Sequence, residues 1–562
     1  MKKPLLFLAS ATILAAAGCS DAPALAEHDA HGANDDGQPR TATPIKHLVV
    51  LFNENRSFDH YFATYPSAAN TPGEPAFSAA GDTPRVNNLA EAHLLAGNPN
   101  FTNVANGSDA AEPFRLDRTQ ANTASQNHGY TAEQQAYHDG RADLFPKFTG
   151  RGTPGGVGAF GTRGQVMGYF DGNTVTAIWN YAQRFAMSDN AYTDTYGPSA
   201  VGALHVVSGQ TDGALVFGGR SGVLADGRGS FTVIGDPGPH GDACSTTRAY
   251  PTQVTMTGRN IGNLLNDAGI SWGSFMGGFD LSLANPNGTT GCARSTFSSV
   301  VGAARADYIP HHAWFQFYPS TSNLAHARPS STEAIGRSLE ADGHTPDPAN
   351  HNYDLDDFYA AVKAGNFPAV SYVKLPAYQD GHAGYSDPLD EQEGTVRLIN
   401  FLQRRPEWKD TAVILTYDDS DGWYDHAYAA PANASYDASA DQLNGPGRCG
   451  TGVATQPQPA GVDGGPVNGR CGPGTRIPFL VISPYARLNY VSHVRISQAS
   501  VVRFIEDNWL KGERLGGGSF DATAGSITDM FDFDRGARED RLFLDPMAGT
   551  RTSGGPDEDR SH

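Results

Sequence analysis

Two pairs of polar side chains stand directly after apolar stretches that lie far apart in the chain. The first stretch is followed by Glu54 and Asn55, and the second by Asp418 and Asp419. Charged groups at the end of a buried strand are costly unless they reach water, hydrogen-bond partners or a cation. All four side chains offer oxygen ligands, which suit a hard divalent ion such as Ca²⁺, Mg²⁺ or Mn²⁺ better than zinc. Taken singly, each pair is equally suited to capping the helix that follows.

A serine introduces the next motif. Residues 196–199 have the sequence Tyr-Gly-Pro-Ser, and a run of small and apolar residues follows from 200 to 207. The pattern predicts a helix with Ser199 as its N-cap. Free N–H groups and the positive end of the dipole make a helix N-terminus suitable for phosphate. A hydroxyl placed there beside a divalent cation can act as a nucleophile, although capping alone also explains the serine.

Histidines supply a third group of candidates. Of 18 His, four stand in motifs of interest, namely His128, His311, His312 and His382. Hydrolysis of a phosphate ester needs donors for the phosphoryl oxygens and an acid for the leaving group, and histidine serves both purposes near neutral pH. Each of these residues is also compatible with a structural role.

The elements that must position these residues are short buried strands alternating with helices. The predicted strands are residues 47–52, 270–275, 369–373, 412–416 and 478–482, and helical patterns cover 396–403 and 498–509. Continuous apolar strands alternating with helices indicate a mostly parallel sheet covered on both faces. Ligands of such sheets bind beyond the carboxyl ends of the strands, where the two acidic pairs are expected.

The N-terminus is typical of an export signal, because Lys2 and Lys3 precede an apolar stretch too short to span a bilayer. Residues 16–19 resemble a lipobox with Cys19 as the acylated residue, whereas residues 24–26 offer an ordinary signal-peptidase site. The predicted organisation is a signal peptide at 1–19, a disordered tether at 20–44, a catalytic domain at 45–545 and a flexible tail at 546–562.

Cysteine number supports this interpretation. The chain has five Cys, and setting Cys19 aside leaves an even number, as expected of a disulfide framework in an exported protein. Three pairings are possible. The local one joins Cys244 to Cys292 and Cys449 to Cys471, and would staple two Gly-rich excursions; four free thiols are the alternative.

Composition excludes several classes of partner. With 40 Lys and Arg against 60 Asp and Glu, the formal net charge is −20, which disfavours nucleic acid and anionic membrane surfaces. Beyond the N-terminus no apolar run approaches the length of a membrane-spanning helix. Hydrophobic content of 39% and 65 Gly indicate a globular chain with long Gly-rich loops.

Several motifs together resemble those of a known family. The longest is residues 45–62, and the later ones, in the same order, are 197–199, 308–312, 378–392, 416–419, 482–487 and 504–509. They are similar to the bacterial phosphoesterase family of non-zinc phospholipases C and acid phosphatases, which belongs to the alkaline-phosphatase-like superfamily. The resemblance covers roughly residues 45–515 and implies a three-layer α/β/α sandwich with long Gly-rich insertions.

The resemblance also implies roles for individual residues. It implies one divalent metal held by Glu54, Asn55, Asp418 and Asp419, with Ser199 as nucleophile and further ligand. It implies phosphate contacts from Asn55, His128, His311 and His312, and we take His382 as the leaving-group acid. The chain departs from the family at Ala200-Val201-Gly202, which puts the details of the phosphate cradle in doubt.

The leading hypothesis is an exported, metal-dependent phosphoester hydrolase of the phospholipase C or acid phosphatase type, working through a phosphoserine on Ser199. The expected location is the periplasm, the outer membrane through a lipid anchor at Cys19, or the medium. The alternative is a surface lipoprotein that keeps the fold and binds a ligand or partner without turnover. The sequence does not choose between a phosphomonoester and a phospholipid substrate.

Overall fold

The computed structural model describes residues 40–450 and 457–552. The chain divides into two units, Met1–Arg40 and Thr41–His562, and the description below concerns the second. The predicted signal peptide, the lipobox and residues 20–39 of the predicted tether therefore lie outside the described residues.

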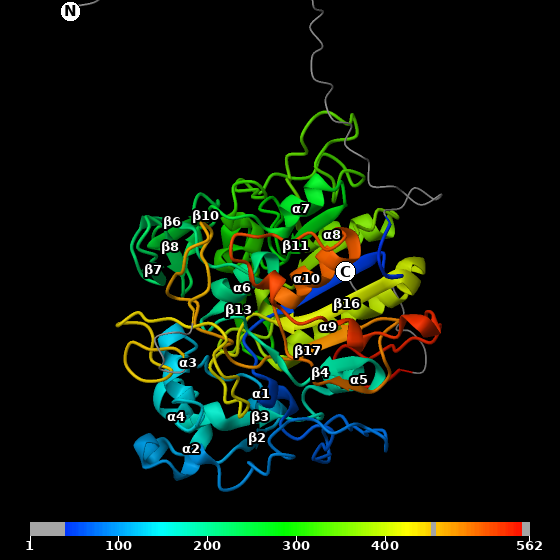
Figure 1. The fold of residues 1–562 in the computed structure, drawn as a ribbon. Helices are drawn as coiled ribbons and strands as arrows, with labels where there is room; N and C mark the ends of the chain where they lie inside the picture. Colours follow the sequence, from blue (N-terminus) through cyan, green and yellow to red (C-terminus); the bar gives the residue numbers. More distant parts are fainter. Residues whose placement is uncertain (1–39, 451–456, 553–562) are drawn as a thin grey trace, which may run out of the picture. The chain divides into compact units, whose positions relative to one another are not determined.

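An eight-stranded sheet forms the centre of the fold (Figure 1). Its strands are short apolar runs whose side chains are buried on both faces, as expected of a sheet with helices on each side. The first five strands are parallel to one another, whereas β17 runs antiparallel to both of its neighbours. In spatial order the strands are β14 (Asn352–Asp354), β11 (Trp272–Met276), β15 (Val370–Lys374), β1 (His47–Asn53), β16 (Thr411–Tyr417), β17 (Phe479–Ile482), β4 (Ala186–Ser188) and β18 (Tyr490–Ser492).

Helices cover both faces of this sheet. On one face α6 (Ser199–Ser208) contacts α7 (Ile261–Asp267) and α10 (Ala499–Trp509). On the other, α9 (Pro388–Gln403) contacts α5 (Thr176–Arg184) and α8 (Leu355–Lys363).

Two tyrosines of the sheet show that these faces are opposite. The Tyr372 hydroxyl donates to a carbonyl of α6 and the Tyr417 hydroxyl to Glu391 of α9. In the strand register Tyr372 is level with Ile414, three residues before Tyr417, so the two tyrosines point to opposite faces. The predicted three-layer α/β/α fold is confirmed.

A smaller five-stranded sheet is inserted after α6, where the sequence predicted only Gly-rich loops. It consists of β7 (Val223–Ala225), β8 (Phe231–Val233), β6 (Ala214–Gly218), β10 (Thr252–Met256) and β9 (Gly238–Pro239). The remaining elements are α1 (Phe58–Phe62), α2 (Pro99–Thr102), α3 (Tyr130–Tyr137), α4 (Phe145–Phe148), β2 (Phe114–Leu116), β3 (Gly168–Phe170), β5 (Ala191–Tyr192), β12 (Ser295–Ser298), β13 (Ala303–Ala306) and β19 (Ile496–Ser497).

Both disulfides of the local pairing are present. Cys244 is bonded to Cys292, 48 residues away, and Cys449 to Cys471, 22 residues away. The first joins the segment after β9 to the segment before β12, and the second lies beside α3, where the backbone N–H of Cys471 donates to the Tyr130 hydroxyl. Of the three pairings that the sequence allowed, the structure contains the local one.

The packed unit extends beyond the boundaries drawn from sequence. Residues 42 and 43, placed in the tether, donate hydrogen bonds to Asn508 at the end of α10. Near the other end Asn180 of α5 donates to the carbonyl of Gly549. Residues 41–44 and 546–552 therefore pack against the catalytic unit, because their backbone groups find partners on its helices.

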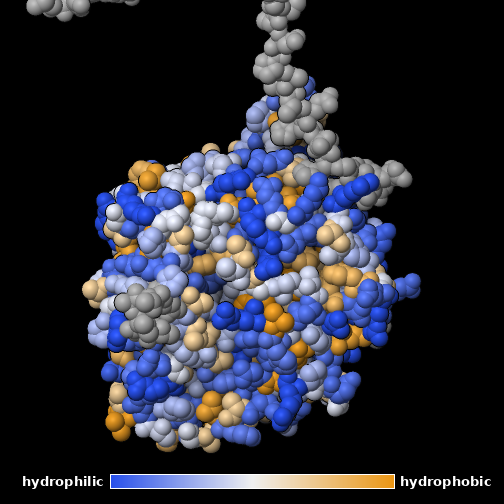
Figure 2. All heavy atoms as spheres, viewed as in Figure 1, coloured by the Kyte–Doolittle hydropathy of each residue, from blue (hydrophilic) through white to orange (hydrophobic). Residues whose placement is uncertain are grey.

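The face drawn in Figure 2 is mostly hydrophilic, with small hydrophobic groups separated by polar side chains. Within 40–450 and 457–552, no helix combines the length and hydropathy needed to cross a bilayer.

Candidate active site

The two acidic pairs meet at the carboxyl ends of adjacent strands. Strands β1 and β16 are paired in register from His47 with Thr411 to Asn53 with Tyr417, so the residues that follow them emerge side by side. The backbone N–H of Asn55 donates to Asp418 Oδ1 at 2.7 Å. We call Glu54, Asn55, Asp418 and Asp419 the strand-end cluster; all four are at most 1% exposed.

Ser199 points into this cluster. Its hydroxyl donates to Asp419 Oδ2 at 3.3 Å and to Asn55 Oδ1 at 3.4 Å. The sequence predicted Ser199 as the N-cap, but α6 begins at Ser199 with Pro198 as its cap, and the serine hydroxyl makes no capping bond. The serine hydroxyl is therefore hydrogen-bonded to the carboxylate and amide oxygens of the strand-end cluster, and it does not accept from a backbone N–H of α6.

Gly202 explains how α6 comes so close to the strand ends. A Cβ atom at this position would lie 2.2 Å from the carbonyl oxygen of Asp418, a distance that no side chain tolerates. The departure from the family motif at Ala200-Val201-Gly202 thus includes a glycine on which the approach of α6 to the cluster depends.

The strand-end cluster concentrates negative charge in a buried place. Burial, together with the neighbouring carboxylate of Asp418, raises the pKa values of Glu54 and Asp419 well above the usual range. Although burial also disfavours charge on Asp418, its contact with Glu54 and the ammonium of Lys374 hold the pKa of Asp418 below its usual value. A nearby cation would stabilise the charged form of all three carboxylates.

The free oxygens of the cluster fit a metal ion. Glu54 Oε2 and Asp418 Oδ2 are buried and have no hydrogen-bond partner in the described part of the chain. Buried polar atoms of this kind ordinarily have a hydrogen-bond partner, and a bound ion would explain why these two atoms have none. The donors around them are carboxylate, amide and hydroxyl oxygens, which suit a hard divalent ion.

A buried lysine lies on the other side of Glu54. Lys374 is the last residue of β15, and its ammonium forms an ion pair with Glu54 Oε1. His312 Nδ1 lies 3.3 Å from the same oxygen and 3.8 Å from Asp380 Oδ2. Burial, His311 and Lys374 lower the pKa of His312 well below its usual value, so its ring is neutral, and its Nε2 has no partner among the described residues.

His128 approaches the cluster from a loop before α3. Its Nδ1 lies 3.0 Å from Asp421 Oδ1, and its Nε2 lies 3.5 Å from the amide nitrogen of Asn55. Although burial disfavours the charged ring, Asp419 and Asp421 raise the pKa of His128 well above 6.5. This histidine therefore carries its proton at neutral pH.

His382 and His311 are different. Burial lowers the pKa of His382 to about 4, and its Nδ1 lies 2.6 Å from the Ala383 carbonyl oxygen. Desolvation of the His382 ring outweighs the carboxylates of Asp421 and Asp418, which favour its charged form. Burial also lowers the pKa of His311, whose Nδ1 lies 2.9 Å from the Tyr250 hydroxyl of the inserted segment.

The N-terminus of α6 holds a carboxylate that the sequence analysis did not identify. The backbone N–H of Ala200 donates to Asp236 Oδ1 at 2.9 Å, although this group was expected to be free for phosphate. Asp236 is exposed and follows β8 in the inserted sheet. We call His128, His311, His382 and Asp236 the rim, because loops and one short 3-10 helix, Pro310–His312, supply them and all are more exposed than the strand-end cluster.

Four further residues near the site were missed by sequence analysis: Lys374, Asp380, Asp421 and Glu133. Lys374 directly follows the predicted strand 369–373, so the signal that identified Glu54 applied to it as well. Asp380 stands two residues before His382, and Asp421 stands two residues after Asp419. Glu133 had no signal; its carboxylate accepts hydrogen bonds from the Gly197 N–H and the Ser420 hydroxyl, and so joins the Ser199 turn to the loop after β16.

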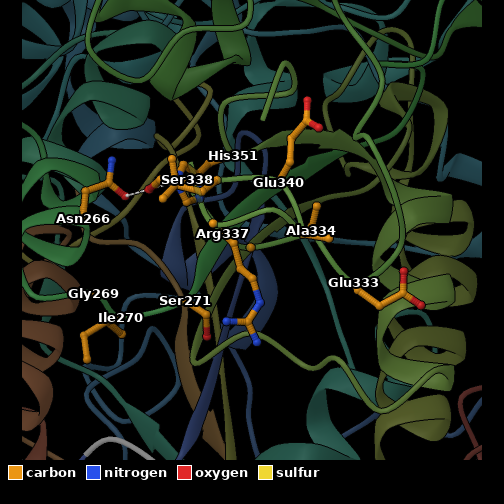
Figure 3. Close-up of a pocket in the computed structure, with 14 residues that line it drawn as sticks. Asn266, Gly269, Ile270, Ser271, Glu333, Ala334, Arg337, Ser338, Glu340 and His351 are labelled. Carbon is orange, nitrogen blue, oxygen red and sulfur yellow. Dashed lines mark hydrogen bonds between the residues drawn. The ribbon is translucent and has the colours of Figure 1, made fainter. Parts of the chain in front are cut away.

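One cavity lies away from this site. It has a volume of about 570 Å³ and is lined by Asn266, Ser271, Arg337 and Glu340 among others (Figure 3). Ser271 immediately precedes β11, which places the cavity at the amino end of that strand, whereas the strand-end cluster follows the carboxyl ends of β1 and β16 in the same parallel part of the sheet.

The chain matches a known family and several known proteins. The family model described as Phosphoesterase family matches residues 45–510. The chain is 25% identical over 522 residues to the hemolytic phospholipase C of Pseudomonas aeruginosa, covering 90% of this chain and 58% of that protein. It is 25% identical over 462 residues to phospholipase C A of Mycobacterium tuberculosis, covering 80% of this chain and 70% of that protein. The chain spans about three fifths of the length of the Pseudomonas relative.

Solved structures give more distant likenesses. An alkaline phosphatase superfamily protein from Vibrio parahaemolyticus is 10% identical, with a TM-score of 0.28 over 70% of this chain and 79% of that one. A variant of the alkaline phosphatase PafA is 10% identical, with a TM-score of 0.30 over 63% of this chain and 93% of that one. These likenesses are too distant to add to the fold described above.

Proposed function

The chain belongs to the phosphoesterase family, and from this premise we propose that it is a metal-dependent phosphoester hydrolase of the phospholipase C or acid phosphatase type. The observation that carries the proposal is the position of Ser199, whose hydroxyl lies between Asp419 and Asn55 at the N-terminus of a helix. A hydroxyl held in a buried cluster of oxygen ligands is arranged for nucleophilic attack on phosphorus.

In the first step Ser199 Oγ attacks phosphorus and the bond to the leaving oxygen breaks, which leaves a phosphoserine. Asp419 Oδ2 takes the serine proton, since it is the carboxylate oxygen that accepts a hydrogen bond from that hydroxyl. A divalent ion held by Glu54, Asn55, Asp418 and Asp419 would supply positive charge to the nucleophile and the phosphoryl oxygens. In the second step water displaces Ser199, whose oxygen regains a proton.

The histidines divide into charged and neutral groups. His128 keeps its proton at neutral pH and supports a role as hydrogen-bond donor to the phosphoryl oxygens or to the leaving group. His382 was our choice for the leaving-group acid, but a pKa of about 4 leaves it without the second proton at neutral pH. We therefore propose His128 as the acid and His382, His311 and His312 as neutral groups that position the phosphate.

Substrate and location are inferred from the relatives and the disulfides. The matched relatives are named phospholipases C, which supports a phosphodiester with a lipid leaving group as the first substrate to assay. Two disulfides fit an exported protein. A lipid anchor at Cys19 remains a proposal, since that residue lies outside the described part of the chain.

The test is hydrolysis of p-nitrophenyl phosphate, an alkyl phosphate and phosphatidylcholine by the purified protein, with and without a chelator. We expect turnover of at least one ester that falls on chelation and returns when Mg²⁺, Mn²⁺ or Ca²⁺ is added. Absence of turnover across these metals and across pH 4–9 would favour the non-catalytic binding protein instead.

A further inference from the structure

Lys374 is a cation placed inside the catalytic cluster rather than on the surface. Its side chain is 3% exposed and its ammonium is paired with Glu54, a proposed metal ligand. It stands at the carboxyl end of β15, directly beside β1, so the same strand pairing that positions Glu54 also positions the lysine. Burying an ammonium is costly, and such a group persists only where a charged partner compensates.

The place that the ammonium faces has the ligands of a cation site. Glu54, His312 and Asp380 offer atoms that all lie within 4.8 Å of one another, and all three side chains are buried. The set combines two carboxylates with an imidazole nitrogen, a combination that binds transition-metal ions such as Mn²⁺ or Zn²⁺. The two carboxylate oxygens of Glu54 differ: Oε1 is paired with the Lys374 ammonium, whereas Oε2 has no hydrogen-bond partner among the described residues.

Five carboxylates in and around the strand-end cluster are buried, namely Glu54, Asp380, Asp418, Asp419 and Asp421. If all five are ionised, one divalent ion and a protonated His128 leave two negative charges uncompensated. The Lys374 ammonium contributes a further positive charge. This charge belongs to the chain itself, so it is present whether or not a second metal ion is available in solution.

We propose that the Lys374 ammonium takes the place of a second divalent ion, so that the site binds one metal ion per chain. The proposal rests on the metal dependence stated above. The ammonium engages Glu54 Oε1 and repels a further cation from Glu54, His312 and Asp380, which leaves Oε2 free for the single ion. Lys374 is in this sense a positioning residue that sets the number of ions.

The test is the number of Mn²⁺ ions bound by the full chain. Metal-stripped protein is titrated with Mn²⁺ by calorimetry, and bound metal is counted by elemental analysis after gel filtration. We expect one ion per chain for the wild type and for Lys374→Arg, which keeps the positive charge. We expect two ions for Lys374→Met, whose side chain has similar length but no charge.

A second substitution shows where the additional ion binds. Lys374→Met combined with Asp380→Asn should return to one ion, because the second place then lacks a charged ligand. If Lys374→Met does not fold, as judged by circular dichroism, Lys374→Gln takes its place. A wild type that binds two ions, or none, would overturn the proposal, and so would a folded Met or Gln variant that binds one.

Binding and catalysis are measured separately, so the two proposals can fail separately. If the ion count changes as expected but no phosphoester is hydrolysed by the wild type, the inference about Lys374 stands and the proposed function fails. If esters are hydrolysed in a metal-dependent manner and the count stays at one in the uncharged variants, the function stands and Lys374 has only a structural role.

Discussion

The strand-end cluster and the rim belong to one site, but different kinds of structural element position their residues. Glu54, Asn55, Asp418 and Asp419 follow two strands whose register sets their positions, and their side chains are almost fully buried. The rim residues come from loops and from an inserted sheet, are more exposed, and bond partly to their own surroundings, as His382 does to Ala383. We therefore propose that the cluster provides the fixed geometry of the site and that the rim contacts the ligand.

Electrostatics separates the two regions further. In the strand-end cluster, burial and mutual repulsion raise the pKa values of Glu54 and Asp419, so the cluster favours a bound cation. In the rim, desolvation makes His382 and His311 neutral, while neighbouring carboxylates keep His128 charged. Residue type alone does not indicate the charge of a histidine; its neighbours decide it.

The largest expected effect comes from the residue that links the two regions. Ser199→Ala removes the nucleophile and should lower kcat by about 10⁴-fold or more, as the loss of a serine nucleophile does elsewhere. Steady-state kinetics on p-nitrophenyl phosphate measures this loss, with Ser221→Ala on the exposed turn after β6 as control. Near-normal turnover by a folded Ser199→Ala variant would remove the covalent mechanism.

The histidines of the rim should differ from one another. His128→Ala removes a group that is protonated at neutral pH and should lower kcat on an alkyl phosphate by about 10²–10³-fold, in the range of general acid catalysis. His382→Ala should cost less at pH 7, since its ring is already neutral.

The pH profile provides the control for this prediction. Because the pKa of His128 is raised, its proton is present below and through neutral pH and is lost only as pH rises through that raised value. The alkaline fall of kcat in the wild type should therefore disappear in His128→Ala. Equal losses in both variants with unchanged profiles would show that neither ring donates the proton.

A smaller change is expected from the strand-end cluster when one charge is removed. Asp418→Asn and Glu54→Gln keep the shape of the ligands and should weaken metal affinity by about 10–100-fold, the range found even for the outer partners of metal ligands. Competition with a chelator measures the affinity, and Asp342→Asn, on an exposed turn, is the matched control. Excess metal should partly restore activity, whereas unchanged affinity in both variants would place the ion elsewhere.

The smallest effect tests whether the rim distinguishes substrates by charge. Asp236→Asn retains an acceptor for the Ala200 N–H but removes a negative charge beside the phosphate position. It should lower KM for a dianionic phosphomonoester by about fivefold, since a unit charge a few ångströms away in a solvated place is worth about 1 kcal/mol. KM for a monoanionic diester should fall less. Asp534→Asn gives the same change in net charge on another exposed segment, and an equal effect there would rule out a local role for Asp236.

Much of the site was predictable because strands carry a readable pattern. The runs 47–52 and 412–416 predicted two parallel strands, and parallel strands bring the residues after them to one edge, so the sequence alone predicts that Glu54 and Asp418 lie together. The four cysteines that follow Cys19 similarly predicted two bridges, although only the structure selected Cys244 with Cys292 and Cys449 with Cys471.

The sequence by itself predicted five of the eight strands of the central sheet, the strand-end cluster and the position of Ser199, because hydrophobic periodicity and local motifs specify strands, helices and their order. Tertiary structure decided what depends on long-range approach and on desolvation. It placed the ammonium of Lys374 on Glu54, and it brought Asp236 from an inserted sheet to the start of α6. It also favours the charged form of His128 and the neutral form of His382, the residue taken from sequence as the acid, because a pKa follows from burial and from neighbours that are distant in the chain.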